Sequence, residues 1–337
     1  MISGTMRLPL FACLLFIGAF SLVGSTDSCF APQEQPAERE GLARLVATCT
    51  KCHEDVCTEW KGTLHAQSWT DPVFQAAIAD RPDKGESCAP CHAPQELMLT
   101  GFGKLPLARK SDREVGVNCV SCHMKGNRYF GPFDSTGHGG VDADASYRKA
   151  DLCLSCHGQP EARAEHDQGS SYLVGTAAKD GQTCQSCHMP AAQRKLVTSP
   201  TIKEKYTIGE QACRVHSFSG ARRGEVVRGA ASMIAAFKSD QLEVVLTALT
   251  GHALPATEGR TVRLKIGFRD AAGVSVGEAY RAWRHGADAL PATGPVTISF
   301  PAGAAQKAQL TLEQELPKVP GRDAAIIQAI AECEATR

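Results

Sequence analysis

Aromatic residues are scarce in this sequence, which has 337 residues and only 6% Phe, Trp and Tyr. Two domains suit this length, and their cores would ordinarily contain more large ring side chains. Net charge is lacking as well, because 36 Lys and Arg balance 36 Asp and Glu. With no basic stripe and no RNA or DNA motif, the sequence argues against a nucleic-acid partner.

Long apolar runs are also missing, apart from one at the N-terminus. Residues 8–23 are almost wholly apolar, follow Arg7 and lead into Val23-Gly24-Ser25, a small-residue cleavage site. This pattern predicts a secretory signal peptide over residues 1–25. The run is short for a membrane span, and Asp27 fits a lipid-modified Cys29 poorly. We therefore expect a periplasmic or extracellular protein whose mature chain has no transmembrane span.

Cysteine, in contrast, is abundant: the chain has 15, and ten of them occur in five copies of Cys-x-x-Cys-His. The motifs are Cys49, Cys52 and His53; Cys88, Cys91 and His92; Cys119, Cys122 and His123; Cys153, Cys156 and His157; and Cys184, Cys187 and His188. A thioredoxin-like pair occurs once, and zinc sites do not require His after every second Cys. This motif is the attachment signal for c-type haem, in which two thiols add to the vinyl groups and His ligates iron. The sequence predicts five covalently attached c-type haems.

Five haems within residues 49–188 leave little room for an ordinary core. We expect short helices and loops wrapped around a haem array, with the haems replacing the missing aromatic bulk. Each haem also adds two propionates, so the holoprotein becomes acidic and can be steered toward basic patches on partners.

The remaining histidines are candidates for the second axial ligand that a low-spin haem requires. Five are predicted distal ligands: His65, His138, His166, His216 and His252. His65 follows Trp60 in a predicted helix over residues 55–68, and His138 lies in a glycine-rich loop that lets backbone approach a flat ring. His285 is left as the spare. Met98 and Met233 are alternative ligands, and bis-His ligation predicts low potentials.

Four further cysteines lie outside the motifs and the signal peptide: Cys29, Cys57, Cys213 and Cys333. In an exported protein an even remainder favours disulfides. A bond between Cys57 and Cys213 is one interpretation, and a free Cys57 is the other.

The composition changes near residue 238, where β-branched residues begin to alternate with polar ones. Strands are predicted over residues 242–249, 261–268, 274–283, 296–300 and 309–313. The fold class is therefore α+β: a signal peptide (1–25), a pentahaem domain (26–237), a small sandwich-like β domain (238–320) and a terminal helix (321–337). The β domain is expected to cap the haem array and to supply His252.

Several segments resemble one known group of proteins. They are EDVCTEWKGTLHAQSWTDPVF (54–74), GVNCVSCHM (116–124), CQSCHMP (184–190) and GHALPAT (251–257). These are similar to the cytochrome c-554-type multihaem family, which is related through haem packing to hydroxylamine oxidoreductase and the pentahaem nitrite reductases. The resemblance covers roughly residues 49–268 and implies that His65 and His252 are axial ligands.

The same resemblance bears on catalysis. The pentahaem nitrite reductases typically have Cys-x-x-Cys-Lys at the catalytic haem and are longer, whereas all five motifs here end in His. The eight haems and the Tyr cross-link of hydroxylamine oxidoreductase cannot be matched here. Both departures lower the expectation of an enzyme.

Three functions follow as hypotheses. The leading one is an electron carrier of mostly bis-His haems, with other cytochromes or a quinol-linked complex as redox partners and no catalytic residue. The second is a reductase of a small nitrogen or sulfur oxyanion at one open haem. The third is a subunit of an extracellular cytochrome filament or oligomer.

Overall fold

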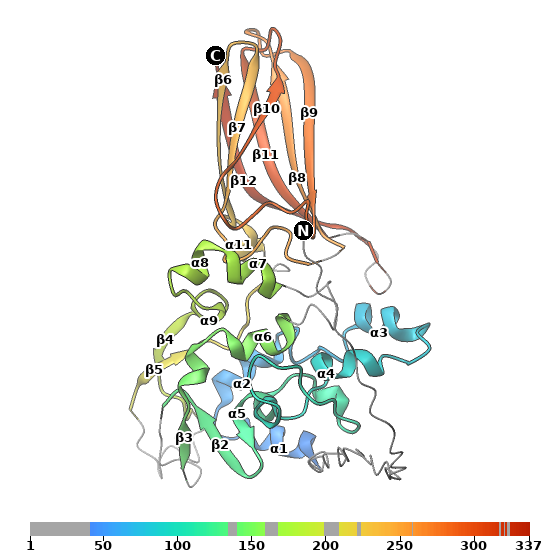
Figure 1. Ribbon diagram of the computed structural model, residues 1–337, viewed down its shortest axis with the longest axis vertical. Coiled ribbons are helices and arrows are strands. Elements are labelled where there is room, and N and C mark those ends of the chain that lie inside the picture. Colours follow the sequence, from blue (N-terminus) through green and yellow to red (C-terminus); the bar gives the residue numbers. More distant parts are fainter. Residues whose placement is uncertain are drawn as a thin grey trace, which may run out of the picture. The chain divides into compact units, whose positions relative to one another are not determined.

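The computed structural model describes residues 41–133, 140–158, 168–198, 209–220, 224–257, 259–316, 318, 319, 321 and 324–337. These residues belong to one compact unit, Glu38–Arg337. Its first part holds the short helices and its last part holds the long strands (Figure 1). The predicted signal peptide and Cys29 lie outside the described residues. Among the helices that the structure describes, none is both long and apolar enough to cross a membrane.

Short helices make up much of the first part of the chain, as predicted. The α-helices are α1 (Leu42–Cys49), α2 (Glu54–Lys61), α3 (Pro72–Ala79), α4 (Ala89–His92), α5 (Cys119–His123), α6 (Asp151–His157), α7 (Gln168–Val174), α8 (Thr176–Lys179) and α9 (Cys184–His188). Between them the described residues form the 3-10 turns η1 (Glu86–Cys88), η2 (Leu97–Leu99), η3 (Arg113–Val115) and η5 (Ala145–Arg148).

Two small sheets lie among these helices. One contains β1 (Met124–Lys125), β2 (Arg128–Gly131) and β3 (Val141–Ala143), and the other is the antiparallel pair β4 (Ala191–Arg194) and β5 (Gln211–Arg214). The described apolar core of this part is small. Its one described cluster contains the buried residues Leu42, Val46, Val120 and Met124, and other apolar residues such as Ile78 and Leu97 are buried outside that cluster. So small a core agrees with the expectation that haem supplies the missing bulk.

The helix predicted over residues 55–68 is shorter than expected. Helix α2 ends at Lys61 because Gly62 follows as its C-cap, and glycine is a poor helix former. His65 therefore lies in the turns that come after the helix.

The last part of the chain is a two-sheet β structure, which follows the short helix α11 (Gly224–Val227). One sheet has the order β10-β7-β6 and the other has the order β12-β11-β8-β9, with antiparallel neighbours throughout. The strands are β6 (Ala231–Lys238), β7 (Gln241–Ala248), β8 (Thr261–Arg269), β9 (Ser275–Arg284), β10 (Val296–Pro301), β11 (Lys307–Leu316) and β12 (Ile326–Thr336).

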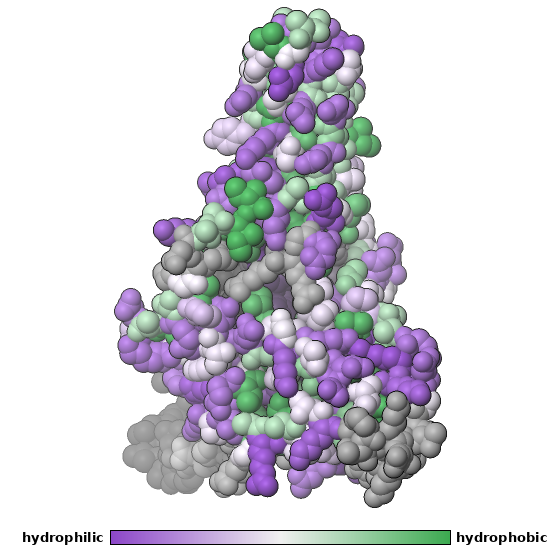
Figure 2. Space-filling view, turned by 180° about the vertical axis from the view of Figure 1, so that it is seen from behind, coloured by the Kyte–Doolittle hydropathy of each residue, from purple (hydrophilic) through white to green (hydrophobic). Residues whose placement is uncertain are grey.

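Alternation of apolar and polar residues builds the core between these sheets. Leu242, Val244 and Leu246 on β7 are fully buried, and so are Leu264 on β8 and Leu310 on β11. All belong to one continuous apolar cluster. On the face that Figure 2 shows, apolar side chains are interspersed with polar ones, which is ordinary for a protein surface.

All five predicted strands are confirmed, as β7 to β11, but two other elements differ from expectation. Strand β6 begins at Ala231, before the predicted boundary at 238. The predicted terminal helix is wrong, because Ile326–Thr336 forms β12 and pairs with β11 along its length. Ala and Glu favour a helix locally, but pairing with β11 and burial of Ile330 in the apolar cluster outweigh that preference.

Candidate haem-ligand site

Each predicted haem motif lies on a short helical turn. The third, fourth and fifth motifs end helices α5, α6 and α9, the second spans η1 and α4, and the first begins at the last residue of α1. A helical turn brings residues three apart to one face, so both thiols of a motif can meet one haem. Helix α5 is fixed by Asn118, whose side-chain oxygen accepts from the backbone N–H groups of Val120 and Ser121.

All five motif histidines bond an oxygen through Nδ1. The distances are His53 to Leu196 O 2.9 Å, His92 to Ser68 O 2.7 Å, His123 to Phe130 O 2.9 Å, His157 to Gln168 Oε1 3.1 Å and His188 to Ser219 O 2.5 Å. An oxygen acceptor holds the proton on Nδ1 and leaves the Nε2 lone pair for a metal. The same arrangement serves His216, which donates to Arg214 O at 2.9 Å, and His252, which donates to Ala253 O at 3.1 Å.

Three predicted distal histidines each face one motif histidine. The ring centroids are 6.1 Å apart for His65 and His157, and 6.3 Å apart both for His123 and His216 and for His188 and His252. Two imidazoles that bind one iron from opposite sides through bonds of about 2.0 Å have centres about 6.3 Å apart. The three pairs therefore fit axial ligation of a haem iron.

Burial keeps these histidines neutral, which a metal ligand must be. It lowers the pKa of His65 to about 3, helped by His157, His188 and His92, and the pKa of His216 to about 4, helped by His123. The pKa of His252 also lies below its ordinary value, again chiefly because of burial.

Cysteine thiols of different motifs lie close enough to interact. The thiol of Cys49 interacts with that of Cys119, the thiol of Cys91 with that of Cys156, and the thiol of Cys153 with that of Cys184. The first motif therefore lies beside the third, and the fourth lies beside both the second and the fifth. Each of the five motifs therefore has its attachment cysteines close to those of at least one other motif.

The two remaining predicted distal ligands, His138 and His166, lie outside the described residues. Phe74 stacks on the ring of His92, with centroids 4.0 Å apart and planes 12° apart. Tyr147 stacks in the same way on His123, at 5.3 Å and 14°. These rings lie against the faces of the imidazoles and fix their orientation.

The proposed disulfide between Cys57 and Cys213 is not formed, since both are free thiols, as is Cys333. Cys57 is buried on α2 and interacts with Cys119, while Cys213 on β5 donates to Ala192 O across the β4-β5 pair at 3.5 Å. Each thiol is therefore held by a different neighbour.

Sequence reasoning missed a supporting ion pair behind His216. The Nη1 and Nη2 atoms of Arg194 donate to the carboxylate of Glu59, and that carboxylate accepts from the His216 backbone N–H at 2.8 Å. It also missed Phe218, whose ring lies 4.5 Å from that of His65. No motif or spacing in the sequence marks these residues, because they meet only after folding.

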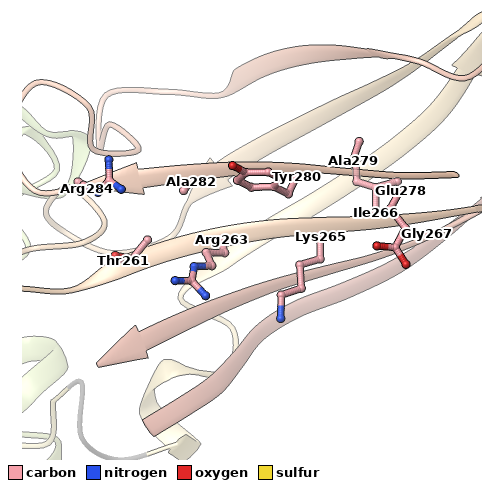
Figure 3. A pocket seen from close by; sticks show the side chains of 10 residues that line it. All are labelled: Thr261, Arg263, Lys265, Ile266, Gly267, Glu278, Ala279, Tyr280, Ala282 and Arg284. Atoms are coloured by element: carbon pink, nitrogen blue, oxygen red, sulfur yellow. The ribbon is translucent and has the colours of Figure 1, made fainter. Parts of the chain in front are cut away.

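A separate hollow of about 640 Å³ lies on the β structure and is lined by residues of the paired strands β8 and β9 (Figure 3). Lys265 and Arg263 line it, and each forms an ion pair with a carboxylate on β11, Glu313 and Glu315 respectively. None of the predicted haem ligands lines this hollow, so the candidate site is the array of histidine pairs.

Comparison with known proteins finds similarity to cytochromes. Residues 48–124 match the family model described as cytochrome c554 and c-prime. Cytochrome c nitrite reductase subunit NrfA of Nitratidesulfovibrio vulgaris (strain Hildenborough) is 28% identical over 45% of this chain. The match spans 35% of that relative's length, about a third.

A solved structure is also similar. The crystal structure of a penta-heme cytochrome c552 from Thermochromatium tepidum has a TM-score of 0.52 and 16% identity, covering 86% of this chain and 98% of that one. At this identity the likeness concerns the fold.

Proposed function

Because this chain is a multihaem c-type cytochrome, we propose that it is exported, holds five haems and carries electrons in respiration. The observation that carries this proposal is the spacing of three histidine pairs, 6.1 to 6.3 Å between ring centroids. An iron held by two imidazoles has no open position for a substrate.

The proposed attachment and ligand residues follow from the motifs and the pairs. The thioether cysteines are Cys49, Cys52, Cys88, Cys91, Cys119, Cys122, Cys153, Cys156, Cys184 and Cys187. The proximal ligands are His53, His92, His123, His157 and His188, and the distal ligands are His65, His138, His166, His216 and His252. The geometry supports assigning His216 to the third motif, His65 to the fourth and His252 to the fifth.

Bound haem supplies reversible one-electron chemistry at its iron. The chain's own residues do the rest. Oxygen acceptors at Nδ1 fix the tautomer of each motif histidine and strengthen its Nε2 as a ligand. The interacting thiols keep the first motif close to the third, and the fourth close to the second and fifth, which favours electron movement between those sites.

The test is low-temperature EPR of the oxidised protein, with haem counted by the pyridine haemochrome assay. Five haems per chain, all low-spin, would support a carrier. A ferric high-spin signal would contradict complete bis-histidine ligation, and a count below five would contradict the haem number.

A second candidate is a reductase of a small oxyanion at one open haem. The observation that favours it is the likeness to a relative named as a nitrite reductase subunit, at 28% identity. A high-spin signal that responds to nitrite, sulfite or hydroxylamine would support it, and a wholly low-spin protein that ignores all three would exclude it.

The proposed location is the periplasm or the cell exterior, with other cytochromes or a quinol-linked complex as redox partners. Fractionation of the producing cells tests the location, since covalent haem makes the protein visible by its own absorption. Haem-stained protein recovered only from the cytoplasm would contradict export.

A further inference from the structure

One short segment outside the haem motifs contacts three of the ligand sites. It is Arg214–Ser219, which we call the positioning segment. We propose that this segment sets the orientation of axial ligands at the third, fourth and fifth motifs, and that the Phe218 ring is its positioning side chain. The proposal rests on the proposed function, because it concerns haem ligands.

The first contact is through His216, which faces His123 at 6.3 Å. Two hydrogen bonds fix it. Its Nδ1 donates to Arg214 O at 2.9 Å within the segment, and its backbone N–H donates to the Glu59 carboxylate at 2.8 Å. Hydrogen bonds therefore hold both the imidazole ring and the backbone of His216 in place.

The second contact is through Phe218. Its ring lies edge-on to His65, with centroids 4.5 Å apart and planes at 69°, and edge-on to His216, at 5.8 Å and 89°. Edge-to-face contact at such distances is the favoured aromatic geometry. Phe218 therefore separates the ligand rings of two sites and limits the rotation of both.

The third contact is through Ser219, whose carbonyl accepts from His188 Nδ1 at 2.5 Å. His188 faces His252 at the fifth motif, and their planes are only 12° apart. The same few residues thus supply a ligand, restrain a second ligand and orient a third.

The backbone conformation of Phe218 also indicates that neighbouring residues hold it in place. Its φ is +43°, in the left-handed region that a bulky residue rarely adopts. Such a conformation persists where neighbouring structure holds it. Two hydrogen bonds hold the residues around Phe218. The Val215 N–H donates to Pro190 O at 2.9 Å, and the hydroxyl groups of Ser217 and Ser219 are hydrogen-bonded at 3.2 Å.

The orientation of axial rings has a spectroscopic consequence. The planes of His65 and His157 are 50° apart. The angle between two axial imidazole planes controls how the iron d orbitals split, and hence the EPR signal of the ferric haem. If the Phe218 ring is removed, His65 gains freedom to rotate, although no ligand has been lost.

The experiment compares holoprotein of Phe218→Leu with wild type by low-temperature EPR and by spectroelectrochemical titration. We expect five low-spin haems in both, with at least one signal moved by more than its line width in Phe218→Leu and the midpoint potential of the same haem shifted. Phe218→Tyr keeps the ring and should give the wild-type signal. Phe237→Leu is the matched control, because Phe237 lies on β6 against Arg337.

The outcomes separate the two proposals. A Phe218→Leu spectrum that superimposes on a wild-type spectrum of five low-spin haems overturns the positioning role and leaves the carrier function standing. Too few haems or a high-spin signal in wild type overturns the carrier function itself. If Phe218→Leu does not mature, Phe218→Met removes the ring instead, and Phe218→Tyr must still match wild type.

Discussion

The ion pair between Glu59 and Arg194 should contribute more to the free energy of unfolding than an exposed ion pair does. Glu59 lies on α2 and Arg194 lies on β4, so the pair joins the first helices to the β4-β5 strands. Their side chains are only 22% and 19% exposed. We predict that Arg194→Met, Glu59→Gln and the double variant will show strong coupling in a double-mutant cycle.

The magnitude follows from the geometry. An exposed pair contributes about 0.5 kcal/mol, whereas breaking a buried one costs about 3 to 5 kcal/mol. This pair is bidentate and about four-fifths buried, and its carboxylate also holds the His216 N–H. We therefore expect a coupling free energy of about 2 kcal/mol. Arg194→Met alone should cost about 3 kcal/mol, because it leaves a carboxylate largely buried without its cation.

The assay is denaturant unfolding of the oxidised holoprotein, followed in parallel by far-ultraviolet circular dichroism and by the Soret band. Comparable m-values among the four proteins are needed for the cycle to be read as stability. A coupling below about 0.5 kcal/mol would refute the reasoning, since the pair would then behave as one exposed to water.

Three further predictions follow. Burial raises the pKa of Glu59, but bonds from Arg194 and the His216 N–H lower it more, so its folded pKa lies below the unfolded value. Its stabilisation is therefore present above about pH 4.3 and is lost as the pH falls through the folded pKa; unfolding scans should show a shallower acid slope for Glu59→Gln. His252→Ala should replace one low-spin EPR signal with a high-spin signal, because His188 would lose its facing ligand; an unchanged spectrum would contradict the assignment. Leu264→Ala, at a fully buried position, should cost about 3 kcal/mol, whereas Ile234→Thr, at a residue 69% exposed, should stay within about 0.5 kcal/mol in the same unfolding measurement.

The features that could be predicted from the sequence are the local ones. A haem motif occupies five consecutive residues, so the motif alone predicts which cysteines attach haem and which histidine is the proximal ligand, and these assignments stay predictions. Alternation is equally local, and it predicted β8 from Val262, Leu264, Ile266 and Phe268, all of which are buried.

The features that could not be predicted depend on contacts between distant residues. The residues of β12 include Ala331, Glu332 and Glu334, which favour a helix in isolation. Pairing with β11 decides otherwise. In the same way, six candidate distal histidines gave no indication of which motif each would face. Glu59 was not singled out because its two partners, Arg194 and His216, lie far along the chain.

The order of these ligands along the chain has a consequence for maturation. All five attachment motifs precede residue 189, whereas His216 and His252 follow it, the latter in the connection between β7 and β8. If export, haem attachment and these ligands are as proposed, a chain still emerging during export would receive every haem before the irons at the third and fifth motifs gain their second ligand. Those two sites would be completed only when the positioning segment and the first strands of the β structure are in place. The change from high-spin to low-spin iron would then report the moment at which the last third of the protein has folded.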